Sequence, residues 1–183
     1  VVYTMWLKRT TPQNIVIGGL AGALPPVIGW AAAAHAAPLN AWLLCAILFM
    51  WTPPHFWALS LYTSEDYGKA GVPMGPVVWG AKKTRTQILI YSLLFVPLAQ
   101  VPLFTGLGHW PYGAVSGPGG VVFLILAFKL WRSTAGDGQP AGETGLYDVR
   151  AGAKSARNLF AFSILYLFAL FAALLAERLL GVL

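Results

Sequence analysis

The sequence predicts an all-α protein, a polytopic bundle of membrane-spanning helices. Of its 183 residues, 57% are hydrophobic and only 10% are charged, whereas an ordinary soluble domain has about 25% charged residues. The mean hydropathy is +0.66. Residues 10–64 and 86–128 contain no Asp, Glu, Lys or Arg, and a helix needs about 20 apolar residues to cross a bilayer. This composition excludes a disordered chain, a coiled coil and a typical cytosolic enzyme, and the single cysteine, Cys45, excludes a disulfide framework.

Each uncharged stretch is long enough for two crossings. The first divides near Pro38 and Asn40, which favour a turn, and the second divides at the Gly- and Pro-containing segment 106–111. We therefore expect five spans, near residues 15–34, 41–62, 87–105, 113–131 and 158–176. The apolar opening segment, residues 1–7, is too short to cross and is interpreted as the tail of a helix whose beginning is missing.

The basic residues predict the orientation. Ten of the twelve Lys and Arg residues lie before the first span, between the second and third, or between the fourth and fifth. Lys129 lies in the last turn of the fourth span, at the same end, and only Arg178 lies at the opposite end. Under the positive-inside rule the basic end is cytoplasmic, so any chemistry is expected there. Topology and anionic lipid account for the net charge of +6, and no nucleic-acid partner is expected.

Two predicted spans contain paired prolines, Pro25-Pro26 and Pro53-Pro54. A proline inside a helix removes an amide donor and kinks the helix, and the freed carbonyls must then face protein or a wet cavity. The kinks serve either packing alone or a widened cavity between the two helices. Gly18 and Gly22 form a small-xxx-small pair, and Gly19 is a further small residue beside it. Together they predict close helix packing.

His55 is the most informative single residue. It lies in the second span, about seven residues or 10 Å from the cytoplasmic end, and ionisable groups inside a membrane are costly and usually functional. Trp51 precedes it by one turn, and Phe56 and Trp57 follow it. Two interpretations stay open: contact with a flat aromatic ligand or proton donor, or a neutral imidazole bonded to a freed carbonyl.

Two charged segments flank the first two spans. Glu65, Asp66 and Lys69 follow the second span, and carboxylates with open positions suit Mg²⁺, although a solvated loop has the same pattern. Lys8 and Arg9 precede the first span, where basic side chains and helix-start amides suit an anion; topogenic charge is the alternative.

Four segments, in order, resemble the protoheme IX farnesyltransferase (heme O synthase) family of UbiA-type intramembrane prenyltransferases. They are YTMWLKRTTPQNIVIGGLAGALPPVIGW from Tyr3, WTPPHFWAL from Trp51, EDYGKAGVPM from Glu65, and KSARNLF with SILYL from Lys154 to Leu167. The resemblance covers essentially the whole chain. It implies a bundle of nine helices, of which residues 1–183 form part of a single transmembrane domain.

The resemblance implies transfer of a farnesyl group from farnesyl diphosphate to a vinyl group of heme B, giving heme O for terminal oxidases. It also implies Mg²⁺, a bacterial inner-membrane location, and heme A synthase or oxidase assembly factors as further partners. Lys8 is implied as the diphosphate contact, Asp66 as catalytic and metal-binding support, and His55 as the catalytic residue on the heme side. The further substrate-binding candidates are Arg9, Asn14, Tyr67 and Lys69.

The chain departs from the family pattern at both Asp-rich motifs. The first motif is absent, so we expect an N-terminally truncated enzyme that is inactive alone, and Glu65-Asp66 replaces the paired Asp found in many superfamily members. The alternatives are another UbiA-type aromatic prenyltransferase and a non-catalytic heme-binding assembly protein. Only His55 lies in a predicted span, which argues against a bis-histidine cytochrome.

Overall fold

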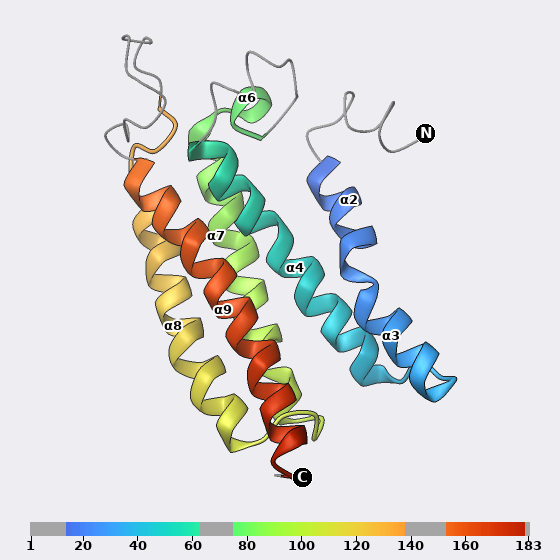
Figure 1. Ribbon diagram of the computed structural model, residues 1–183. Helices are drawn as coiled ribbons and strands as arrows, with labels where there is room; N and C mark the ends of the chain where they lie inside the picture. Colours follow the sequence, from blue (N-terminus) through green and yellow to red (C-terminus); the bar gives the residue numbers. More distant parts are fainter. Residues whose placement is uncertain (1–13, 63–74, 138–152, 182–183) are drawn as a thin grey trace.

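The computed structural model describes residues 14–62, 75–137 and 153–181, and every regular element within these ranges is helical (Figure 1). The elements are α2 (Asn14–Ala23), α3 (Pro25–Ala34), α4 (Leu39–Tyr62), α6 (Gly75–Trp79), α7 (Ala81–Leu98), η2 (Val101–Leu103), α8 (Trp110–Trp131) and α9 (Ala153–Leu179). The segments long and apolar enough to cross a membrane are Val16–Ala34, Leu39–Leu61, Ala81–Leu103, Trp110–Trp131 and Lys154–Leu179. The predicted fold class and five spans are confirmed, and the chain is an integral membrane protein.

The first span consists of two helices rather than one bent helix. α2 ends at Ala23, and α3 begins at Pro25 after a single intervening residue, Leu24. Pro25 and Pro26 occupy the first turn of α3, where a missing amide has no intrahelical partner to lose. The carbonyl of Leu24 accepts a hydrogen bond from the Val27 amide at 3.0 Å. The predicted proline kink is thus the end of one helix and the start of the next.

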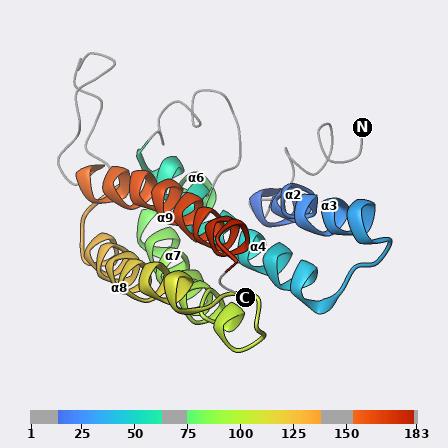
Figure 2. The ribbon, with the colours of Figure 1, turned by 60° about the horizontal axis from the view of Figure 1, so that its bottom comes forward.

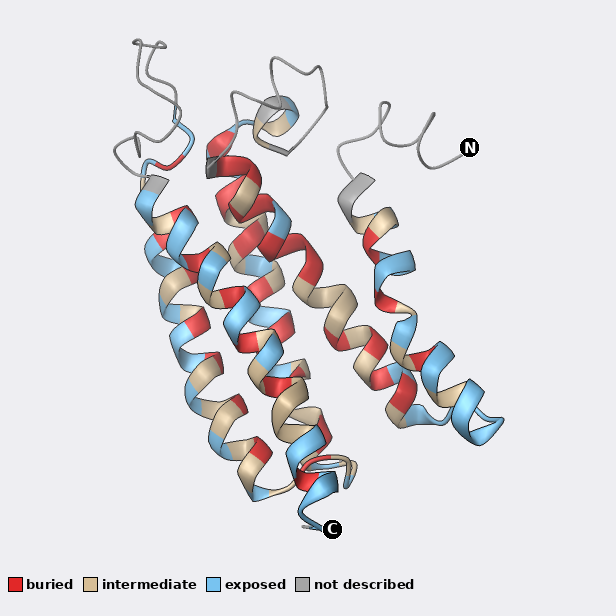
Figure 3. Ribbon diagram, viewed as in Figure 1, coloured by how far each residue is buried: buried red, intermediate tan, exposed pale blue. Residues whose placement is uncertain are grey.

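α4 is the central helix of the described bundle. It packs against α7 and α9 on one side and against α2 and α3 on the other (Figure 2). Inside the bundle, 56% of the α4 span is buried, compared with 11% of the α2–α3 span, and Figure 3 shows this contrast along the two segments. Side chains of α4 are therefore the best placed to form an interior site.

A glycine allows α2 to approach α4 closely. A Cβ atom added to Gly19 would lie 2.8 Å from Cγ2 of Thr52, too close for any side chain, whereas a Cβ on Gly22 would meet nothing within 4 Å. The prediction of close packing in this span is correct, but Gly19 makes the contact and Gly22 does not.

Polar groups join the three remaining long helices inside the apolar bundle. The Ser116 hydroxyl donates to the Gln100 side-chain oxygen at 2.8 Å, and the Gln100 amide donates to the Ser116 carbonyl at 3.1 Å. The Tyr166 hydroxyl donates to the same carbonyl at 2.8 Å. Because an unpaired polar group is costly in a bilayer, these bonds fix α8 against α9 and against the end of α7.

The predicted connection between the second and third spans is partly helical, which corrects the sequence interpretation. α6 and the first turns of α7 lie in the region expected to be a loop, so Lys82, Lys83 and Arg85 belong to α7. Gly80, with φ of 80°, separates the two helices, and such a positive φ favours glycine. The start of α7, the end of α8 and the start of α9 lie at one end of the bundle (Figure 1).

Candidate functional site

His55 lies in the interior of the membrane bundle, as predicted. α4 continues through Pro53 and Pro54 to Tyr62, and His55 is buried with 7% of its surface exposed. Its Nδ1 atom lies 2.7 Å from the Ser163 hydroxyl oxygen of α9. The interpretation of a histidine bonded to a carbonyl freed by proline is therefore wrong for Nδ1, whose partner is a side chain of another helix.

Aromatic rings cover both faces of the His55 imidazole. The Trp51 ring stacks on it with centroids 4.1 Å apart and planes at 18°, and the Phe160 ring stacks at 4.6 Å and 23°. Phe56 meets the ring edge-on at 5.1 Å. The predicted aromatic surroundings are confirmed for Trp51 and Phe56, whereas Trp57 points elsewhere and packs edge-on against Trp79 and Tyr91 on other helices.

Ser163 is the residue on which the polar contacts of this site converge. Its hydroxyl donates to the Phe160 carbonyl at 2.6 Å, and its backbone carbonyl accepts a hydrogen bond from the Trp51 indole N–H at 2.9 Å. Together with the His55 contact, these bonds join α4 to α9. Sequence reasoning missed Ser163 and Phe160 as site residues, because no pattern in one sequence shows which face of α9 packs on α4.

An apolar groove adjoins this cluster at the level of the membrane. It has a volume of about 450 Å³ and lies among α3, α4 and α9. The side chains that line it include Pro25, Pro26, Leu48, Trp51, Leu167 and Phe171. Trp51 thus belongs to both the groove and the His55 cluster. A long hydrocarbon chain in this groove would lie against the same indole that stacks on the imidazole.

The structure does not describe the side chains of the other predicted site residues, so their positions relative to His55 are not given. Lys8, Arg9, Asp66, Tyr67 and Lys69 lie outside the described residues. Asn14 is the first residue of α2, and only its place in the helix is described.

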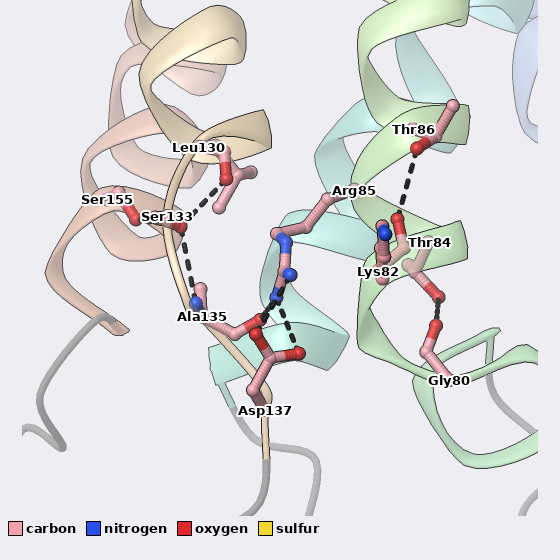
Figure 4. Close-up of polar contacts among 10 residues, drawn as sticks. All are labelled: Gly80, Lys82, Thr84, Arg85, Thr86, Leu130, Ser133, Ala135, Asp137 and Ser155. Carbon is pink, nitrogen blue, oxygen red and sulfur yellow. Dashed lines mark hydrogen bonds and ion pairs between the residues drawn. The ribbon is translucent and has the colours of Figure 1, made fainter.

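An ion pair between a buried arginine and an exposed aspartate organises the basic end of the bundle. The Arg85 guanidinium donates to both carboxylate oxygens of Asp137 at 2.9 and 3.0 Å and to the carbonyl of Ala135 (Figure 4). Arg85 is 5% exposed, and its place between two predicted spans gave no sign of this burial. Because Arg85 comes from the second turn of α7 and Asp137 from the segment after α8, the pair fastens that segment across the end of the bundle.

Comparison with known proteins places the chain among prenyltransferases. The family model described as UbiA prenyltransferase family matches residues 1–141. Three similar proteins are each named protoheme IX farnesyltransferase. The protein from Caulobacter sp. (strain K31) is 67% identical, and the match covers 99% of this chain and 56% of the relative. The protein from Caulobacter vibrioides is also 67% identical, over 100% of this chain and 57% of the relative. The protein from Hyphomonas neptunium is 60% identical, over 99% of this chain and 54% of the relative.

The chain spans about half the length of the curated relatives it matches. No solved structure matches it significantly.

Proposed function

Since this chain belongs to the UbiA prenyltransferase family, we propose that it takes part in transferring a farnesyl group from farnesyl diphosphate to a vinyl group of heme B, which gives heme O. The names of its bacterial relatives, protoheme IX farnesyltransferase, support the choice of substrates. The proposed site is the His55 cluster together with the adjoining apolar groove.

The observation that carries the proposal is the double role of Trp51. One indole stacks on a buried imidazole and also lines a membrane-level groove of about 450 Å³. An allylic diphosphate develops positive charge on its first carbon as the diphosphate leaves, and an aromatic face attracts a cation. The groove suits the isoprenoid chain, and the stacked rings of Trp51, His55 and Phe160 suit a flat porphyrin edge.

The described residues show no binding site for magnesium. Within residues 14–62, 75–137 and 153–181, no group of three or more His, Cys, Asp or Glu side chains is arranged to hold a metal ion. Asp66, the proposed metal-binding and catalytic residue, lies outside these ranges. So do Lys8, the proposed diphosphate contact, and Arg9, a further substrate-binding candidate. A role for Mg²⁺ at Asp66 therefore rests on the sequence, as do the roles of Asn14, Tyr67 and Lys69 in substrate binding.

The basic end of the bundle is proposed to face the cytoplasm of a bacterial cell, with the protein in the inner membrane. Lys82, Lys83 and Lys154 are exposed near the helix ends that gather there. Positive residues next to membrane spans favour the cytoplasmic side. An anionic diphosphate would approach from that side.

The test is prenyl transfer by the complete gene product that contains this chain, purified in detergent. Heme B and farnesyl diphosphate are supplied with Mg²⁺, and the extracted heme is analysed by mass spectrometry. We expect heme that has gained a farnesyl group. Prenylation of another aromatic acceptor in place of heme would favour a different aromatic prenyltransferase, and tight binding of unmodified heme would favour an assembly protein.

Two variants connect the activity to the site. We expect His55→Ala to lower heme O formation by about 100-fold or more, the usual contribution of a positioned acid or base, and Asp66→Ala to lower it strongly. His35→Asn is the matched control, because His35 is an exposed histidine with φ of 53° that ends α3, and asparagine tolerates this conformation. Wild-type heme O levels in His55→Ala would remove His55 from the site, and wild-type levels in Asp66→Ala would remove Asp66.

A further inference from the structure

The hydrogen bonds of Ser163 determine where the proton of His55 lies. A serine hydroxyl has one proton and can accept further hydrogen bonds. The Ser163 hydroxyl donates that proton to the Phe160 carbonyl at 2.6 Å. Toward His55 Nδ1, 2.7 Å away, the oxygen is therefore an acceptor, and Nδ1 must be the donor. A neutral imidazole with a proton on Nδ1 has a free electron pair on Nε2.

The remaining contacts hold the ring so that only this nitrogen is left for a substrate. Trp51 and Phe160 cover the two faces of the imidazole. Among the described residues Nε2 has no hydrogen-bond partner, and it is not one of the unpaired polar atoms that are fully buried, which are on Trp57, Arg85 and His109. Nε2 is therefore the ring nitrogen left for a substrate, while Nδ1 is tied to α9.

We propose that Ser163 is a positioning residue, which holds His55 in the Nδ1-protonated form so that Nε2 accepts a proton during prenyl transfer. This inference rests on the proposed function. Ser163 itself touches neither substrate; it acts through the imidazole.

The proton arises from the chemistry of a vinyl acceptor. The terminal vinyl carbon forms a bond to the first carbon of the isoprenoid, and the bond from that carbon to the diphosphate oxygen breaks, with the electron pair leaving on the diphosphate. The vinyl carbon attached to the porphyrin is left as a cation. That cation is discharged by addition of water or by loss of hydrogen from a neighbouring carbon, and either route releases one proton, which Nε2 accepts.

The experiment compares Ser163→Ala with Ser163→Thr in the complete gene product, with heme O formation measured at varied concentrations of both substrates. We expect Ser163→Ala to lower kcat by about tenfold, with little change in either KM. This is less than the roughly 10²–10⁴-fold that a positioned acid or base contributes, because the imidazole is misplaced and not removed. Ser163→Thr keeps a hydroxyl and is expected to retain kcat within about threefold of wild type. Ser92→Ala is the matched control, since Ser92 is a buried helical serine whose hydroxyl donates to the Ile88 carbonyl four residues earlier.

A double mutant separates positioning from a merely structural role. If Ser163 acts through the imidazole, Ser163→Ala has no further effect on kcat in a His55→Ala background. The inference is overturned if Ser163→Ala keeps wild-type kcat, if Ser163→Thr loses as much as Ser163→Ala while both fold, or if the loss is undiminished in the His55→Ala background. Absence of heme O with the wild-type protein would instead overturn the proposed function itself, before any variant is compared.

Discussion

The indole of Trp51 and the imidazole of His55 lie one turn apart on α4 and stack with their centroids 4.1 Å apart and their planes at 18°. The indole N–H also donates to the Ser163 carbonyl at 2.9 Å, and the same side chain lines the apolar groove. The position of the imidazole and the shape of the groove therefore depend on one residue.

Replacement of Trp51 should affect both parts of the site. Trp51→Ala removes an aromatic pair and a hydrogen bond, which together contribute about 2 kcal/mol, and it also widens the groove. We expect a fall in kcat together with a rise in the KM for farnesyl diphosphate. Trp51→Phe keeps a ring but loses the N–H donor, so its effect should be the smaller of the two. Steady-state kinetics in detergent would measure kcat and KM for both variants. An unchanged KM for farnesyl diphosphate in Trp51→Ala would show that the isoprenoid does not bind in the groove.

Filling the groove should weaken binding of the isoprenoid without disturbing the imidazole. Leu167 lines the groove, so Leu167→Trp should raise the KM for farnesyl diphosphate by about tenfold, equivalent to about 1.4 kcal/mol. Leu165→Trp is the matched control, because Leu165 is on the same helix, is 61% exposed and does not line the groove. Equal kinetics for the two variants would show that the isoprenoid lies elsewhere.

The ion pair between Arg85 and Asp137 should stabilise the fold. Removing the partner of a buried, hydrogen-bonded charge leaves that charge poorly compensated. Asp137 is the more exposed partner, with 47% of its side chain accessible against 6% for Arg85, so we expect Asp137→Ala to cost about 1–2 kcal/mol. Arg85→Lys cannot reproduce the two parallel bonds and should also lower the unfolding temperature.

Thermal unfolding in detergent checks this prediction, with Lys83→Ala as the control, since Lys83 is exposed two residues away on α7. An unfolding temperature for Asp137→Ala equal to that of Lys83→Ala would show that the ion pair adds nothing to stability.

The spans were predictable because the bilayer imposes a simple rule on sequence. A crossing must be apolar and about 20 residues long, so charges and turn residues suffice to divide the chain. The helix ends were less predictable. α7 begins at Ala81 rather than near residue 87, and α9 begins at Ala153 rather than near 158. Charged residues mark the edge of the membrane but not the end of a helix, because a helix can continue through them into water.

The site was only partly predictable for a different reason. His55 stood out because an ionisable residue inside an apolar run is costly, and its helical neighbours Trp51 and Phe56 follow from spacing on α4. Ser163 and Phe160 are more than 100 positions away, and their role depends on which face of α9 packs against α4. The ion pair of Arg85 could not be predicted, because its partner, Asp137, lies 52 residues further along the chain.

A carboxylate from α9 caps the start of α8 at the end of the bundle opposite the basic residues. Glu177 is 2% exposed, and its oxygens accept the backbone N–H groups of His109 at 2.9 Å and Tyr112 at 2.6 Å. The N-cap side chain of α8 makes no capping bond of its own, and negative charge at a helix N-terminus is favourable.

Loss of this carboxylate should therefore destabilise the packing of α8 against α9. Glu177→Ala leaves two amides without partners in an apolar setting, at about 1–3 kcal/mol each when buried, so we expect a clear drop in unfolding temperature. Glu177→Gln keeps one acceptor oxygen but turns an NH₂ group toward an N–H donor, and should fall between Glu177→Ala and wild type. Arg178→Ala, at the exposed neighbouring position, controls for general changes at this end. Thermal unfolding in detergent decides the order, and a Glu177→Ala protein as stable as Arg178→Ala would show that water or lipid headgroups satisfy these amides equally well.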